Sequence, residues 1–390
     1  MNETRGGQDE CSRCTQVRKR FLEKEKLNPV NKLLQIHTEY KIVTEGGKKR
    51  QGAKPKTTGK KIFLNQVAKA ASALRNSGGG VLLVHVQGTS QEDRCLEYFD
   101  EAVRNELTGL LENGELYTDV YERKCLCQVE AFEDITDFVQ IKIGKVESVC
   151  TVDFNTKASN DSENLSINSL NLQVLLRKTE SPAGSFSTAK LPHNVQDLQE
   201  NRHIQLKTFK YTKEVTSIKV DAQKLTDYIW NTLKLKDNIT SMSKVVGGGS
   251  YFLGVSESKL TTKEGYTTKK PEYTGFKLDI SQELLRERIY RKLKSDICVL
   301  DPEGHFTEGP KDLVDIRFHT TPGHCADLTV LEVAIRYCHG VVFYDKGPRT
   351  YCVTESGATK MENVLRMDRC EWFQRLRIMH SNAHTQTVEE

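Results

Sequence analysis

The stretch that decides the fold is Val245–Ser258, which reads VVGGGSYFLGVSES. Three glycines lead into a short apolar run, Tyr251–Val255, that is too brief for a helix and rich in residues that favour strands. A polar turn that carries Glu257 follows. Glycines before a strand indicate a sharp turn or a close approach of the backbone, because residues with a Cβ rarely adopt positive φ. The stretch therefore predicts a buried strand that begins at a glycine turn.

A second copy of this phrase, NSGGGVLLVHV at Asn76–Val86, lies about half a chain earlier. A phrase that recurs in this way indicates two related structural units. The length of 390 residues points the same way, because single hydrophobic cores stop growing at about 250–300 residues. We therefore expect an α/β fold of the α+β type, built as two related lobes.

The composition is polar but globular. Hydrophobic residues make up 37% of the chain and charged residues 28%, with a mean hydropathy of −0.55. No apolar run approaches the length of a membrane span, so we expect no membrane association. The first residues contain no apolar segment of the secretory type, and the eleven cysteines are an odd number. Both features favour reduced thiols in the cytoplasm, with the nucleus as the alternative.

The charges are unevenly distributed. Lys48–Lys61 holds seven basic residues and no acid, whereas Gln91–Gln140 holds 14 acids against four basic residues. A third cluster follows a helical pattern: Arg286, Arg288, Arg291, Lys292 and Lys294. Basic clusters of this kind are what binding to a phosphate backbone requires, and a solvated surface is the alternative interpretation of each.

The N-terminal segment contains one short motif, Cys11-Ser-Arg-Cys14. A CxxC pair supplies only two of the four ligands that a structural zinc ion needs, and no second pair lies nearby. We therefore expect residues 1–30 to form a charged tail, flexible or helical, without a metal.

Periodicity predicts the remaining elements. Helices are expected at Lys60–Leu74, Cys95–Leu111, Asp221–Leu235, Ser281–Lys294 and Asp368–Ile378. Strands are expected at Cys125–Val129, Phe138–Ile143, Leu172–Arg177, Glu200–Phe209, Asp327–Val333 and Gly340–Phe343. The Asn- and Ser-rich segment Asn155–Asn171 is expected to be a loop. The resulting division is a tail at 1–30, a first lobe at 31–180, a linker at 181–194, a second lobe at 195–380 and a tail at 381–390.

Taken in order, these segments resemble the core domain of the Schlafen family. In that family a strand bearing Glu-x-x-x-x-Glu-Phe-Lys precedes a helix, the phrase GGYLFIGVDD, a further helix and a zinc site. The corresponding segments here are ENRHIQLK at Glu200–Lys207 and GGSYFLGVSE at Gly248–Glu257. Asn76–Gly80 is similar to a phrase of the amino-terminal lobe, and the second half resembles the family's divergent AlbA-like domain. Order and spacing carry the resemblance, which covers most of the chain.

The resemblance implies two pseudo-symmetric lobes in a horseshoe that binds structured RNA, above all tRNA and rRNA. Several members of the family cleave RNA with three acidic residues. A carboxylate cluster holds the Mg²⁺ or Mn²⁺ that activates water on a phosphodiester. By the motif, Glu200 takes the first acidic position, Gln205 the second and Glu257 the third. An amide brings no negative charge, so RNA binding is implied and endoribonuclease activity is left open.

The resemblance also implies two sets of binding residues. The phosphate contacts would come from basic residues beside the acidic positions: Lys207, Lys210, Arg288, Arg291 and Lys292. A structural zinc ion would be held by Asp296, Cys298, Cys338 and His339, with His305 as the alternative to Asp296. Thiolate, imidazole and carboxylate are all competent zinc ligands.

ATP is not expected, because the chain lacks Gly-x-x-x-x-Gly-Lys-Ser/Thr and its glycine triplets lead into strands rather than helices. Homodimerisation stays open. The alternative function is that of a catalytically inactive Schlafen-type interaction protein, acting in growth control or antiviral response, whose acidic segment Gln91–Gln140 binds a protein partner.

Overall fold

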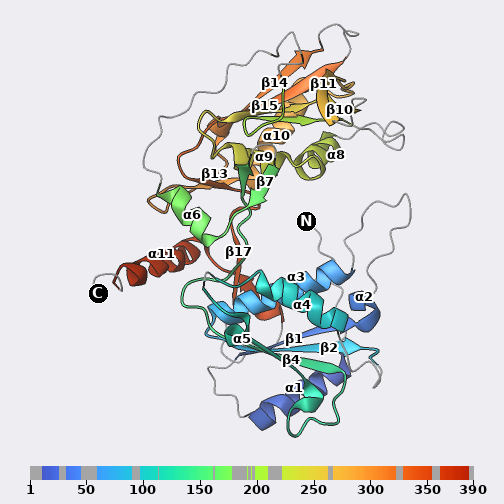
Figure 1. The fold of residues 1–390 in the computed structure, drawn as a ribbon, viewed down its shortest axis with the longest axis vertical. Helices are drawn as coiled ribbons and strands as arrows, with labels where there is room; N and C mark the ends of the chain where they lie inside the picture. The colour runs from blue at the N-terminus through green and yellow to red at the C-terminus, as the bar shows by residue number, and fades with distance from the viewer. Residues whose placement is uncertain are drawn as a thin grey trace. The chain divides into compact units, whose positions relative to one another are not determined.

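The computed structural model describes residues 11–25, 32–44, 59–89, 97–112, 114–160, 163–177, 191, 195, 198–209, 222–261, 267–321, 328–353 and 361–385. The chain forms two compact units, Met1–Asp153 with Arg349–Glu390 and Phe154–Pro348. Both mix helices with strands, so the α+β class is confirmed (Figure 1). Among the described residues, no helix combines the length and apolar character needed to cross a bilayer.

The first unit is built on a four-stranded sheet of order β1-β2-β4-β3. Its strands are β1 (Lys32–Glu39), β2 (Gly80–Gln87), β3 (Tyr121–Cys125) and β4 (Phe138–Ile143). β1 and β2 run parallel, and the other two pairs are antiparallel. The helices are α1 (Ser12–Glu25), α2 (Tyr40–Thr44), α3 (Gly59–Asn76), α4 (Glu97–Thr108), α5 (Tyr117–Val120) and α11 (Arg369–Thr385).

Side chains of successive strand residues point to opposite faces of this sheet. Leu34 and Leu82 point to the face covered by α3 and α4, where they pack with the small residues of α3. The neighbouring residues Leu33 and Val81 point to the opposite face and pack against α1, whose Phe21 is fully buried. Figure 1 shows α3 and α4 on one side of the sheet and α1 on the other. Residues 12–25 therefore form part of the folded unit and not a separate tail, because their apolar stripe covers one face of the sheet.

A glycine turn links α3 to β2, as the sequence predicts. Gly78, Gly79 and Gly80 all have positive φ. A Cβ at Gly80 would lie 2.3 Å from the carbonyl oxygen of Lys32, so β1 and the turn can approach only through a residue without a side chain. A three-stranded sheet of order β18-β17-β5 completes the unit, from β5 (Thr151–Asp153), β17 (Arg349–Val353) and β18 (Val364–Arg366), with η1 (Leu126–Gln128) and η5 (Met361–Asn363) as short turns.

The second unit repeats this sheet topology. Its main sheet has the order β14-β15-β9-β8, built from β8 (Ile204–Lys207), β9 (Gly249–Leu253), β14 (Val314–Thr320) and β15 (Thr329–Ile335). Parallel β8 and β9 correspond to β1 and β2, while antiparallel β15 and β14 correspond to β4 and β3. The repeated glycine phrase therefore marks a repeated unit of structure.

The phrase at Val245–Ser258 enters β9 through a turn of the expected kind. Gly247 and Gly248 have positive φ, and a Cβ at Gly248 would lie 2.1 Å from the carbonyl oxygen of Ile335. All five residues of β9 are buried. The helices of this unit are α6 (Ser169–Leu176), α8 (Ala222–Asp227), a π-helical turn (Tyr228–Thr232), α9 (Leu235–Met242), α10 (Gln282–Asp296) and the short η4 (Lys311–Leu313).

Smaller sheets surround the main one. They are the hairpins β6 (Lys157–Asn160) with β7 (Glu163–Ser166) and β10 (Val255–Thr261) with β11 (Thr267–Tyr273), and a sheet of β12 (Cys298–Leu300), β13 (Phe306–Glu308) and β16 (Val341–Phe343).

Three sequence expectations about this region differ from the structure. Asn155–Asn171 contains the β6-β7 hairpin, and Leu172–Arg177 lies in helix α6 and its end, not in a strand. The Asn residues taken as signs of a loop cap this helix: Asn168 Oδ1 accepts from the backbone of Asn171 at 2.8 Å. The units divide at Phe154 and not at 181–194, because β17 returns to pair with β5.

Candidate functional site

The residues at the first two acidic positions contact each other in the second unit. Glu200 precedes β8, and its Oε1 accepts hydrogen bonds from the side-chain amide of Gln205 and from the backbone of Leu206, the latter at 3.1 Å. Asn201 closes the turn between them, its Oδ1 accepting from the backbone of His203 at 2.7 Å. The glutamine is thus a hydrogen-bond donor to the first carboxylate and not a second acid.

Lys207 completes this cluster. Its Nζ lies 3.6 Å from Glu200 Oε1, and the two side chains are 28% and 12% exposed. Burial lowers the pKa of Lys207, while the negative charges of Glu200 and Glu257 oppose that shift. The structure therefore brings Glu200, Gln205 and Lys207 together and places Glu257, on β10, within electrostatic range of the lysine.

This cluster differs from a three-acid metal site. Across the described residues, only one group of three or more His, Cys, Asp or Glu side chains has ligand atoms within 4.8 Å of one another, and it lies in the first unit. At β8 the cation of Lys207 stands beside the first carboxylate. The protein itself supplies a cation for the first carboxylate, and among the described residues Glu200 and Glu257 belong to no group of three or more such ligands.

The other expected RNA contacts lie on α10, except Lys210, which is outside the described residues. Helix α10 buries Leu285, Ile289 and Leu293, which leaves its basic side chains on the outer faces. The three expected contact residues, Arg288, Arg291 and Lys292, each have an intramolecular partner. Arg288 donates to Gln223 (3.3 Å), Arg291 pairs with Glu287, and Lys292 lies 3.1 Å from Asp296 and 3.8 Å from Asp227.

The expected zinc ligands of the second unit do not form a metal group in the described residues. Asp296 ends α10 and pairs with Lys292, whereas Cys298 is fully buried in β12. Cys338 and His339 instead line a cavity of about 530 Å³. The alternative ligand His305 pairs with Asp301 at 3.2 Å. The structure therefore corrects the zinc assignment to these residues. The carboxylate of Asp296 takes part in a salt bridge, and the thiol of Cys298 is packed in the core.

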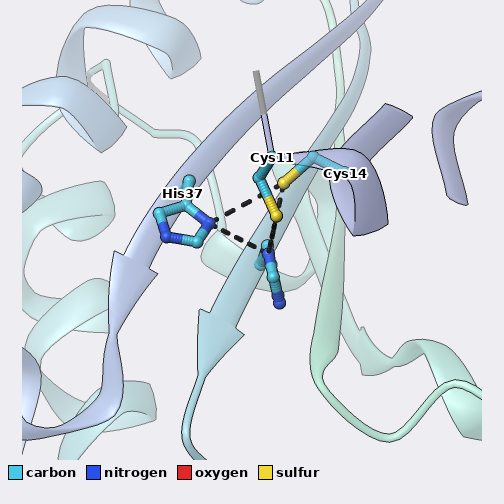
Figure 2. A group of neighbouring side chains, drawn as sticks. Cys11, Cys14 and His37 are labelled. Carbon is cyan, nitrogen blue, oxygen red and sulfur yellow. Dashed lines mark hydrogen bonds between the residues drawn. The ribbon is translucent and has the colours of Figure 1, made fainter. Parts of the chain in front are cut away.

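The metal-competent group consists of Cys11, Cys14, His37 and His85 in the first unit. Figure 2 shows both sulfur atoms and the His37 ring turned toward a common point. His85 Nδ1 lies 2.9 Å from His37 Nδ1, 3.2 Å from Cys14 Sγ and 3.7 Å from Cys11 Sγ, and Cys14 Sγ lies 3.8 Å from His37 Nδ1. Four soft and borderline ligand atoms thus converge in one place.

Local structure explains the convergence. The backbone of Thr15 donates to the carbonyl of Cys11 at 3.1 Å, so Cys11 begins the first helical turn and Cys14 lies one turn on, on the same face. In the parallel β1-β2 ladder His37 is the register partner of His85. Both therefore point to the face of the sheet that α1 covers.

A carboxylate orients one of the histidines from behind. His85 Nε2 lies 3.2 Å from Asp137 Oδ2, and Arg13 lies 3.4 Å from the same carboxylate. Although burial opposes it, hydrogen bonds from His85 and Arg13 lower the pKa of Asp137 to about 2. The ionised carboxylate accepts a hydrogen bond from the Nε2 side of His85, and the Nδ1 atom of this ring faces the cysteines.

Burial differs within the group. Cys14 and His85 are buried, Cys11 is half-buried and His37 is exposed. Burial, followed by the neighbouring Cys11, raises the pKa of the Cys14 thiol to about 12. Burial and the adjacent His85 lower the pKa of His37. His37 therefore provides the side of the group that is open to solvent.

Sequence reasoning missed this group because its four members come from three separate segments. The CxxC motif has no second pair nearby in the sequence, and its histidine partners are 23 and 71 residues from Cys14. One signal was available: His85 interrupts the apolar run VLLVHV, and a polar ring in a buried strand needs a partner.

No family model matches the sequence, and no curated protein matches it either. The relation to the Schlafen family therefore stays a hypothesis. Function is inferred from the side chains described above.

Proposed function

We propose that this chain is a Schlafen-type protein that binds structured RNA, with tRNA and rRNA as the ligand class, through the region around β8. The observation that carries this proposal is the position of Lys207. Its ammonium group lies beside Glu200, within range of Glu257, and its side chain is still 28% exposed. A partly desolvated ammonium group is suited to a phosphate oxygen.

In this proposal Lys207 takes the role that a divalent cation has in a three-acid site. A metal bound by carboxylates attracts the phosphate and also activates water. An ammonium group supplies the attraction alone. Because Gln205 donates to Glu200 rather than adding a charge, Mg²⁺ or Mn²⁺ would have to displace Lys207 to reach the carboxylate. We therefore propose RNA binding with cleavage that is slow or absent.

The basic residues of α10 would add to the binding energy. Exposed ion pairs contribute only about 0–1 kcal/mol each, so the pair of Arg291 with Glu287 is readily exchanged for a contact with phosphate. Each phosphate neutralised in this way releases counterions and makes the affinity depend on salt. A-form RNA is recognised mainly by its shape, and weak sequence preference is expected.

Fluorescence anisotropy with labelled tRNA at rising salt concentration tests the proposal. The full-length protein should bind at low salt. Lys207→Gln should reduce the affinity, and it should lower the slope of log affinity against log salt concentration by about the contribution of one phosphate contact. Lys145→Gln is the matched control, because Lys145 is an exposed lysine of the first unit that pairs with Glu147. Failure to bind even at low salt would overturn the proposal in favour of a protein-interaction role.

Incubation of the same tRNA with Mn²⁺ tests the proposed lack of efficient cleavage. The expected result is intact RNA over the period in which binding is complete. Defined fragments that disappear in both Glu200→Gln and Glu257→Gln would show that the two carboxylates suffice for a metal-dependent nuclease.

A further inference from the structure

We propose that Cys11, Cys14, His37 and His85 form a tetrahedral binding site for a structural Zn²⁺ ion. The site lies in the first unit and is independent of the proposed RNA-binding region. Two thiolates and two imidazoles are a common ligand set for structural zinc. Each of the four residues offers one ligand atom, and all four atoms lie within 4.8 Å of one another.

The distances between ligand atoms fit one small ion. With Zn–S bonds of about 2.3 Å and Zn–N bonds of about 2.05 Å, tetrahedral geometry separates ligand atoms by about 3.3–3.8 Å. Four of the six separations among the two sulfurs and two nitrogens run from 2.9 to 3.8 Å, and all six lie within 4.8 Å. The two Nδ1 atoms are 2.9 Å apart, so a movement of a few tenths of an ångström brings that pair to the tetrahedral separation.

The same geometry selects the ion. A two-iron, two-sulfur cluster also takes two Cys and two His, but on different irons, so the width of the cluster separates the pairs. Here Cys14 Sγ lies 3.2 Å from His85 Nδ1, which leaves room for a single ion. Mg²⁺ and Ca²⁺ prefer oxygen ligands. Four protein ligands leave no open position, so the ion has a structural and not a catalytic role.

His85 has the hydrogen-bonding surroundings that are usual for a histidine that binds zinc. A ligating histidine usually donates its second ring N–H to a carboxylate, which fixes the ring and makes the free nitrogen more basic. Asp137 accepts from His85 Nε2 in this way, and Arg13 holds Asp137 from the other side. Arg13 lies between the two cysteines in the chain, so Cys11 and the first turn of α1 supply both thiol ligands and the support for a third.

Zinc at this position would connect α1 to the sheet. The helix has 14 residues, a length at which isolated helices are marginal in water. Its apolar contacts with the sheet come from Cys14, Val17 and Phe21. An ion bound to both cysteines and both histidines adds bonds from the first turn of α1 to β1 and β2, so its removal should release α1 first.

Metal analysis of the full-length protein, purified without chelators and reconstituted with Zn²⁺, is the direct test. One zinc per chain is expected, with X-ray absorption showing two sulfur neighbours at about 2.3 Å and two nitrogen neighbours at about 2.0–2.1 Å. Replacement by Co²⁺ should give the visible bands of a tetrahedral thiolate site. A reconstituted protein that holds no zinc, or whose zinc has no sulfur neighbours, would overturn the proposal.

Variants locate the ion. His37→Ala changes an exposed side chain and should lose stoichiometric zinc while the fold is kept, and Cys14→Ser should do the same. Asp137→Asn should keep the ion with affinity lowered about 10–100-fold, measured by competition with a chelator. Cys338→Ser is the control and should keep one zinc. Loss of zinc in Cys338→Ser together with its retention in His37→Ala would instead place the ion in the second unit.

Discussion

Replacing Gln205 with glutamate is the sharpest test of the cluster at β8. Gln205 is 7% exposed and its amide donates to Glu200. The substitution removes a hydrogen bond to a charged group, worth about 2 kcal/mol, and sets two carboxylates against each other. At about 4 Å and an effective dielectric constant of about 20, that repulsion amounts to about 4 kcal/mol. Lys207, 3.6 Å from Glu200, offsets part of it.

The expected net cost of Gln205→Glu is about 2–4 kcal/mol at pH 7, which corresponds to about 5–15 °C in the melting temperature of a unit of this size. The new carboxyl would have a raised pKa in the folded state. The destabilisation caused by the new carboxyl is therefore fully present above that raised pKa. It disappears as the pH falls below about 4.3, the pKa of a glutamate in the unfolded chain. Mn²⁺ should also relieve it, because a third carboxylate at this position completes a metal site.

Thermal denaturation of wild type and variant at pH 7 and pH 4.5, with and without Mn²⁺, measures these effects. Gln128→Glu is the control: this glutamine is exposed, and such changes usually lie within about 0.5 kcal/mol. An unchanged melting temperature for Gln205→Glu at pH 7 would refute the contact with Glu200. A destabilisation that persists equally at pH 4.5 would refute the electrostatic explanation.

Four further outcomes are expected. Phe21→Ala should destabilise the first unit by about 3–5 kcal/mol in a urea titration, because this ring is fully buried between α1 and the sheet. Gly248→Ala should prevent normal folding, since its Cβ would lie 2.1 Å from the Ile335 carbonyl, whereas Gly88→Ala, with positive φ but open space, should cost only about 1 kcal/mol. Burial lowers the pKa of Lys244 to about 7. Between pH 7 and 10 the unfolded chain therefore binds more protons at this lysine than the folded chain, and the free energy of unfolding should rise with pH. Lys244→Met should abolish this dependence of stability on pH. A chelator should expose the N-terminal helix to proteolysis before the rest of the first unit.

Much of the fold followed from local pattern. The glycine triplets predicted turns that lead into buried strands, and Gly80 and Gly248 have the positive φ and close backbone approach that exclude a Cβ. Their repetition predicted two related units, and the two main sheets share one topology. Helix α10 begins after Ser281, as its capping pattern indicates. These features depend on neighbouring residues, whose spacing is visible in the chain itself.

The candidate sites depended on contacts that spacing does not reveal. Lys207 pairs with the Glu200 carboxylate and Gln205 donates a hydrogen bond to it, a side-chain arrangement that residue types alone leave open. The Cys/His group was missed and zinc was assigned elsewhere, because its ligands converge only when parallel pairing sets His37 beside His85. The sequence by itself determined the glycine turns, the buried strands that follow them and helices such as α10, through period, capping and the missing Cβ. Only the tertiary structure decided which polar side chains meet, because strand register and helix docking bring together residues that are far apart in the chain.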